Sequence, residues 1–189
     1  MNQTQSNLGI SKSPVSFYMN SWGVVFSLLF VICAYALRKS VFAHGGWQLA
    51  AVWLIAIFGL GEGAGSGLFP YDHIAGKLTW SGNLHTIFSA IGDTAMVLLP
   101  FVLVKIFTKQ HFPKLSVYSW FVAITGPVLI IVFLLARANY LPLRGLWQRL
   151  FLLDYYSLLM VVALDMLVTY SNSVSGQRQL RSDSHPSSL

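Results

Sequence analysis

Five side chains that can bind a metal ion or move a proton lie close together in the chain: Glu62, Asp72, His73, His85 and Asp93. Carboxylates and imidazoles are ligands that Zn²⁺ and similar divalent ions accept. A histidine beside a carboxylate also transfers protons near neutral pH. We expect Asp72, His73 and His85 to be the candidate metal ligands. Glu62 and Asp93 are the candidate catalytic groups that move a proton.

These residues do not match a recognised metal or catalytic motif. The sequence contains no HExxH, no paired HxxxH and no cysteine pair, because Cys33 is the only cysteine. The structural alternative is that Asp72 and His73 cap a helix end while His85 makes a hydrogen bond at the membrane interface. Whether the protein is an enzyme stays open at this point.

Three of the polar residues are spaced for one face of a helix. His85, Ser89 and Asp93 follow one another at intervals of four residues, which places them in a single stripe. Glu62 and Asp93 both lie inside apolar runs, where an unpaired charge is costly. An acid at that depth is protonated or partnered, and it marks a functional site by default.

The elements that must position these residues are membrane-spanning helices. Hydrophobic residues make up 55% of the 189 and charged residues 10%, well below the roughly 25% charged of a soluble domain. A bilayer crossing needs about 20 apolar residues. Five segments qualify: about Phe17 to Leu37, Trp47 to Phe69, Leu84 to Phe107, Leu115 to Ala136 and Leu146 to Tyr170.

We therefore predict an all-α, polytopic transmembrane bundle over residues 17–170, embedded in a lipid bilayer. Residues 1–16 and 171–189 are polar and are expected to be disordered tails. Ala34-Tyr35-Ala36 imitates a signal-peptidase site, but Arg38 and Lys39 follow at once, the opposite of a signal peptide's charge bias. We expect the first span to stay as an anchor.

Basic residues set the expected orientation. With the N-terminus outside, seven Lys and Arg residues fall on the inner side and five on the outer side, which favours an outer N-terminus and an inner C-terminus. These residues sit in short clusters at the ends of apolar runs, as in membrane proteins. The formal charge of +6 therefore does not indicate a nucleic-acid-binding face.

Two further features concern packing. Gly59, Gly63 and Gly67 fall on one helical face, where another helix can approach closely, so a homo-oligomer or a partner helix could use this face. Phe69-Pro70 should end the second helix. In the last span Arg149 and Asp154 are a candidate ion pair, although their spacing of five residues requires some bending.

Three short motifs resemble one family. They are the glycine run Gly63 to Gly67 leading into Phe69-Pro70-Tyr71-Asp72, the pair Leu84-His85, and Gly145-Leu-Trp-Gln-Arg149. Between about Trp47 and Val168 the chain resembles the uncharacterised bacterial and archaeal family called domain of unknown function 998.

The resemblance implies a compact bundle, typically of six transmembrane helices, with no assigned reaction, so a sixth span stays open. It also implies a bacterial inner membrane. The recurring residues of the family map onto Phe69, Pro70, Asp72 and His85.

The leading functional expectation is a membrane protein with a polar pocket of Asp, Glu and His side chains between spans two and three at the outer face. One alternative is a metal-dependent hydrolase that acts on a lipid. Another is a small proton-coupled transporter with Asp93 as its proton site, and the last is an accessory subunit that packs on a partner through its glycines.

Overall fold

The protein is a bundle of long apolar helices with one small hairpin at an end. The computed structural model describes residues 4–39 and 45–183, with the side chains of the last helix described up to Val168. Among these residues five helices are long and apolar enough to cross a membrane. The predicted all-α membrane fold and its five spans are confirmed.

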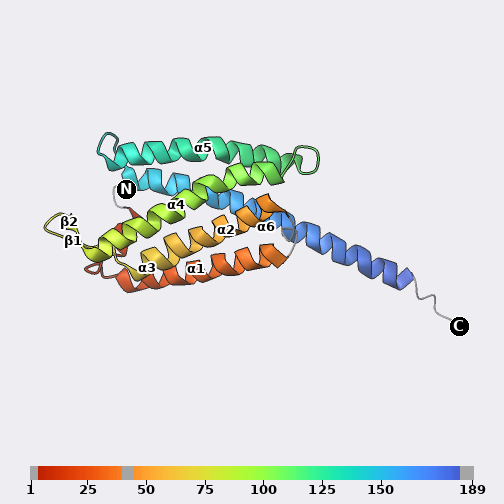
Figure 1. Cartoon of the computed structure of the whole chain (residues 1–189), viewed down its shortest axis with the longest axis horizontal. Helices are drawn as coiled ribbons and strands as arrows, with labels where there is room; N and C mark the ends of the chain where they lie inside the picture. The colour runs from red at the N-terminus through yellow and green to blue at the C-terminus, as the bar shows by residue number, and fades with distance from the viewer. Residues whose placement is uncertain (1–3, 40–44, 184–189) are drawn as a thin grey trace.

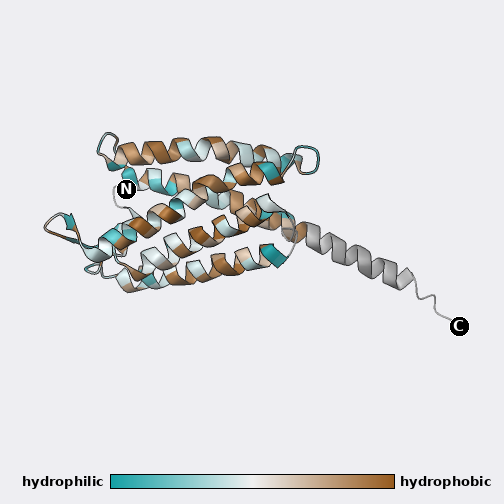
Figure 2. Cartoon of the chain, viewed as in Figure 1, coloured by the Kyte–Doolittle hydropathy of each residue, from teal (hydrophilic) through white to brown (hydrophobic). Residues whose placement is uncertain are grey.

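The spanning elements follow one another up and down the bundle (Figure 1). Apolar residues cover the middle of the helices, and polar residues gather at the turns and helix ends (Figure 2). The helices are α1 (Ser16–Lys39), α2 (Gly46–Phe58), continued by a π-helix (Gly59–Gly65) and α3 (Ser66–Leu68), then α4 (Trp80–Ile106), α5 (Pro113–Arg137) and α6 (Arg144–Asp183).

Two pairings organise the core. α2 packs on α4, and α5 packs on α6, while α1 covers the π-helix. The most deeply buried side chains come from several helices and include Phe58, Leu99, Val122 and Tyr155. The C-terminal part of α6 continues beyond the other helices (Figure 1), past residue 171, where the sequence predicts a disordered tail.

The second span ends two residues before Pro70. Phe69 has extended backbone angles, φ −115° and ψ 98°, as a residue before proline prefers. The chain then forms an antiparallel hairpin, β1 (His73–Ile74) and β2 (Lys77–Leu78). Ala75 and Gly76 both have positive φ, 50° and 77°, as a two-residue hairpin turn of type I′ needs. The sequence analysis treated this segment only as a loop.

A π-helix in the middle of the second span was also not predicted. Gly61 and Gly65 face α4. A Cβ added at Gly61 would come within 2.7 Å of the Phe88 carbonyl oxygen, and a Cβ added at Gly65 would come within 2.4 Å of the Phe88 Cβ. Gly63 faces α1, where a Cβ would come within 2.8 Å of the Gly23 oxygen. The alternating glycines thus let this segment lie between two helices at backbone contact. Glu62 lies within this π-helical segment.

The residues before α1 fold over the same end of the bundle. A short 3₁₀ helix, η1 (Gln5–Leu8), is tied to α6 by a hydrogen bond of 2.9 Å from the Gln5 amide to the Gln148 side chain. Asn20 donates to the Gly9 carbonyl, and Ser11 binds Asp72. Side chains of α1, α6 and the loop before the hairpin thus bind backbone polar groups between residues 5 and 11, within residues 1–16, for which the sequence predicts a disordered tail; residues 1–3 lie outside the described residues.

Candidate functional site: a polar cavity at the hairpin end

Glu62 is the centre of a small hydrogen-bond network between the π-helix and α4. Its carboxylate accepts a hydrogen bond from the Ser89 hydroxyl and a longer one, 3.5 Å, from the Ser66 hydroxyl. The two serine hydroxyls lie 3.3 Å apart. Glu62 can contact Ser89 of α4 because Gly61 and Gly65 let α4 approach the π-helix closely.

His85 lies next to this network and is buried. Its Nδ1 lies 2.8 Å from the Phe69 carbonyl oxygen and 3.1 Å from the Ser66 carbonyl oxygen. Both partners are acceptors, so Nδ1 carries the proton and donates to them. In the neutral ring Nε2 is then an acceptor, and it is buried with no hydrogen-bond partner.

A cavity of about 410 Å³ opens beside these groups. The predicted stripe of His85, Ser89 and Asp93 lines it together with Glu62. Tyr71, further residues of α4, and residues of α5, α6 and η1 supply the rest of its wall. This cavity is thus lined by every spanning element except α1, whereas the sequence analysis expected a pocket between spans two and three.

A smaller cavity of about 120 Å³ lies on the α1 side of the same centre. Glu62 and His85 line both cavities, so they stand between them. Residues of η1 also line both. The N-terminal segment thus covers the cavities at the hairpin end of the bundle.

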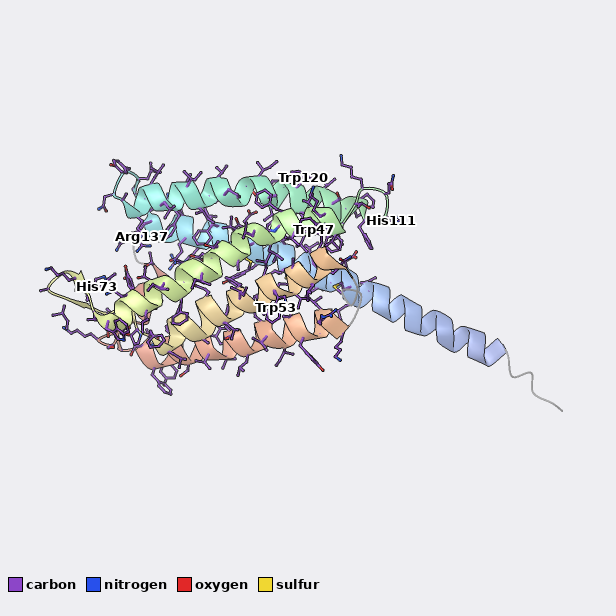
Figure 3. All side chains as sticks on the ribbon, in the orientation of Figure 1. Trp47, Trp53, His73, His111, Trp120 and Arg137 are labelled. Carbon is purple, nitrogen blue, oxygen red and sulfur yellow. The ribbon has the colours of Figure 1, made fainter. Side chains whose placement is uncertain are left out.

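The larger cavity carries basic as well as acidic groups. Arg137, the last residue of α5, and Arg144, the first of α6, both line it. Asp93 and Glu62 line the same cavity as these arginines. Arg137 also donates a hydrogen bond of 3.4 Å to the Tyr71 hydroxyl. Figure 3 shows Arg137 and His73 at the same end of the bundle, with His111 at the other.

The three expected metal ligands do not gather into one ligand set. Asp72 accepts hydrogen bonds from Ser11, whereas His85 is bound to backbone carbonyls. The Tyr71 ring lies against both His73, at 4.6 Å between ring centres, and His85, at 5.2 Å. Within the described residues no three His, Cys, Asp or Glu side chains could hold one metal ion.

Asp72 instead anchors the N-terminal segment. Its carboxylate accepts a hydrogen bond of 2.8 Å from the Ser11 amide and another from the Ser11 hydroxyl. The Ser11 hydroxyl is the main reason that the pKa of this carboxyl lies below its usual value. The Asp72 carbonyl accepts a hydrogen bond from the Thr79 amide, which closes the loop before α4.

The other sequence candidates have packing roles. Gly59, Gly63 and Gly67 lie against α1, so a helix of the same chain covers the face that the sequence offered to a partner. Arg149 donates to the Gly145 carbonyl one turn earlier in α6, and Asp154 accepts a hydrogen bond of 2.8 Å from Thr125 of α5. No ion pair joins Arg149 and Asp154 in the part of the chain that the structure describes.

Sequence reasoning missed several residues of the cavity. Arg137 and Arg144 were considered only as basic residues at span ends, and Gln148 only as part of the motif Gly145 to Arg149, and none was expected to line a cavity. They come together because the turn between α5 and α6 places all three on the cavity wall. A signal was available in the sequence: two arginines flank the turn between two apolar spans.

The fold and this cavity define a multi-pass helical membrane protein with an ionisable site inside the bundle. A family model described as "Protein of unknown function (DUF998)" matches residues 1–165. The chain belongs to this family, as its motifs indicated. No curated protein and no solved structure matches it.

Proposed function

We propose that the protein binds a small amphiphilic molecule in the larger cavity, with a hydrogen-bond donor of that molecule on the Glu62–His85 centre. The observation that carries the proposal is the pairing of Glu62 and His85 on the wall of one cavity, with the Nε2 of His85 buried and without a partner. A buried polar group without a partner is costly, so such a group calls for a ligand or water. The Glu62 carboxylate beside it is a second acceptor.

The rest of the wall fits the apolar part of such a molecule. Val97, Leu98, Ile130 and Leu134 line the cavity further along α4 and α5. Binding sites for small molecules combine an apolar wall with a few polar groups in this way. With the N-terminus outside, the site lies near the outer face of the membrane, in a bacterial inner membrane by the family resemblance.

This function is favoured over the metal-dependent hydrolase. The hydrolase needs Asp72, His73 and His85 around one metal ion, and their side chains have other partners. The accessory-subunit alternative needs a free glycine face, and α1 covers that face.

The proposal is tested by native mass spectrometry of the protein released from nanodiscs of a polar lipid extract. Wild type is expected to retain a bound molecule that Glu62→Gln loses, because the amide replaces an acceptor oxygen with a donor. Asp165→Asn is the matched control, since Asp165 is exposed on α6 and does not line the cavity. Equal retention in wild type and Glu62→Gln would reject the proposal.

Proton-coupled transport is a second candidate, favoured by the two carboxylates, Glu62 and Asp93, that line one cavity. In such carriers intramembrane acids load and release the coupling proton. In liposomes a pH gradient should then drive uptake of the bound molecule, and Asp93→Asn should abolish the uptake while binding persists. Uptake that does not respond to the gradient would exclude coupling.

A further inference from the structure

The larger cavity has two chemically different ends. Glu62, an acceptor, and His85 form one end beside the π-helix. Arg137, Arg144 and Gln148 form a donor end beside the turn between α5 and α6. We infer that the ligand of this cavity is a phospholipid whose headgroup carries an amine, with the phosphate on the arginines and the ammonium group on Glu62 and His85. This inference rests on the binding function proposed above.

The donor end suits a phosphate. Guanidinium groups bind phosphate oxygens through several hydrogen bonds at once. Gln148 is 9% exposed, and its Oε1 accepts the Gln5 amide. With Oε1 engaged in this way, the Nε2 amide is the donor group of this side chain. Two guanidinium groups and an oriented amide therefore line one end.

The acceptor end suits an ammonium group. An ammonium group has three N–H donors and no acceptor, and it can donate to the Glu62 carboxylate while it lies beside His85. A trimethylated amine carries the same charge with no N–H donor, so it makes no hydrogen bond to Glu62. The site is therefore expected to distinguish the two headgroups by hydrogen bonding as well as by charge.

The position of the cavity suits a lipid rather than a soluble molecule. Leu98 and Leu134, which line it, are 49% and 51% exposed, so an exposed apolar surface continues the cavity wall along α4 and α5. In a membrane that surface faces acyl chains. The cavity thus reaches the bilayer between α4 and α5, while the arginines stand at the ends of their spans, where headgroups lie. A lipid can leave its acyl chains in the bilayer and place its headgroup inside.

The test compares two lipids that differ only in amine methylation. Full-length protein in nanodiscs is given phosphatidylethanolamine and phosphatidylcholine of the same acyl chains, and native mass spectrometry measures the retained lipid. Wild type should prefer phosphatidylethanolamine by about tenfold, the effect of losing a charge-assisted hydrogen bond. No preference between the two lipids would overturn the inference.

Variants separate the two ends. Arg137→Gln with Arg144→Gln should lose lipid binding by about tenfold or more, since phosphate loses its charged partners. Arg149→Gln is the matched control, because this exposed arginine of α6 does not line the cavity. An unchanged affinity in the double variant would overturn the assignment of the phosphate. Far-ultraviolet circular dichroism and the unfolding temperature check that both variants are folded.

A soluble headgroup tests whether the ligand is a phospholipid or a free phosphoethanolamine. Phosphoethanolamine without acyl chains should fail to displace the lipid at millimolar concentration if the acyl chains contribute to binding. Displacement by the soluble compound at the same concentration as the lipid would overturn the lipid assignment. If a bound molecule depends on Glu62 but shows neither headgroup preference nor dependence on the arginines, the proposed binding function stands and this inference fails.

Discussion

At the residue scale, Glu62 shows how far local sequence can lead. Its position in an apolar run predicted a partnered or protonated acid, and the structure gives it two serine partners. Ser66 follows it by one helical turn, but Ser89 comes from α4. The stripe of His85, Ser89 and Asp93 followed from the helical period. That this stripe faces Glu62 depends on helix packing, which no local pattern contains.

Asp72 gives a prediction about pH. Hydrogen bonds from Ser11, and the charges of His73 and Lys12, lower the pKa of this carboxyl, and burial acts in the opposite direction. A carboxyl whose pKa is lowered on folding stabilises the fold above its ordinary pKa of about 3.9 and loses that effect as the pH falls through the lowered value. The N-terminal segment should therefore detach in acid.

Hydrogen exchange measures this detachment. After correction for the intrinsic exchange rate, the Ser11 amide should be protected at about pH 6 and lose about fivefold of that protection in acid, the effect of one net hydrogen bond. Asp72→Asn should show the weaker protection at both pH values, and Asp165→Asn should behave as wild type. Protection that is unchanged in Asp72→Asn would show that other contacts hold the segment.

At the scale of elements, hydropathy predicted the five spanning helices, because burial in lipid requires a continuous apolar run whatever the neighbours are. It did not predict the π-helix. The π-helix lies where α1 and α4 both pack against the alternating glycines. We therefore attribute it to tertiary packing, which a local sequence pattern does not contain. The hairpin was missed for another reason: its two-residue strands are too short to show a period.

The glycine contacts give a prediction for this element. In Gly61→Ala the new Cβ would come within 2.7 Å of the Phe88 oxygen and 2.8 Å of the Gly92 nitrogen. Both are backbone atoms of α4, so the helices must separate, at a cost of about 1–3 kcal/mol in the free energy of unfolding. Unfolding by denaturant in detergent micelles measures the change.

Gly46→Ala is the control for that experiment. Nothing lies within 4 Å of a Cβ added at Gly46, so its stability should equal or exceed that of wild type. Because Gly61 lies beside Glu62, the Gly61→Ala variant should also weaken retention of the bound molecule. A Gly61→Ala protein as stable as Gly46→Ala would mean that the π-helix and α4 are further apart than the structure places them.

At the scale of the whole molecule, the cavity was the part that sequence could not predict. The sequence indicated its acids and its histidine from their cost inside a membrane. Its basic end and its N-terminal cover depend on how α5, α6 and η1 are arranged around α4, and these segments are far apart in the chain. Contacts of this kind follow from the whole fold.

The orientation of the molecule is the last prediction. The hairpin, η1 and the turn between α5 and α6 lie at one end of the bundle, which holds Lys12, Lys77 and three arginines (Figure 1). The other end holds more basic residues, including Lys105, Lys109 and Lys114. By the positive-inside rule the hairpin end, with the arginines of the cavity, should face outward.

Single cysteines test this directly. In a Cys33→Ser background, Ile74→Cys at the exposed hairpin should react with a membrane-impermeant maleimide in intact cells. His111→Cys, in the turn between α4 and α5, should react only after the cells are permeabilised. The opposite result would place the arginine end of the cavity in the cytoplasm, and the amine-bearing phospholipid would then be drawn from the inner leaflet.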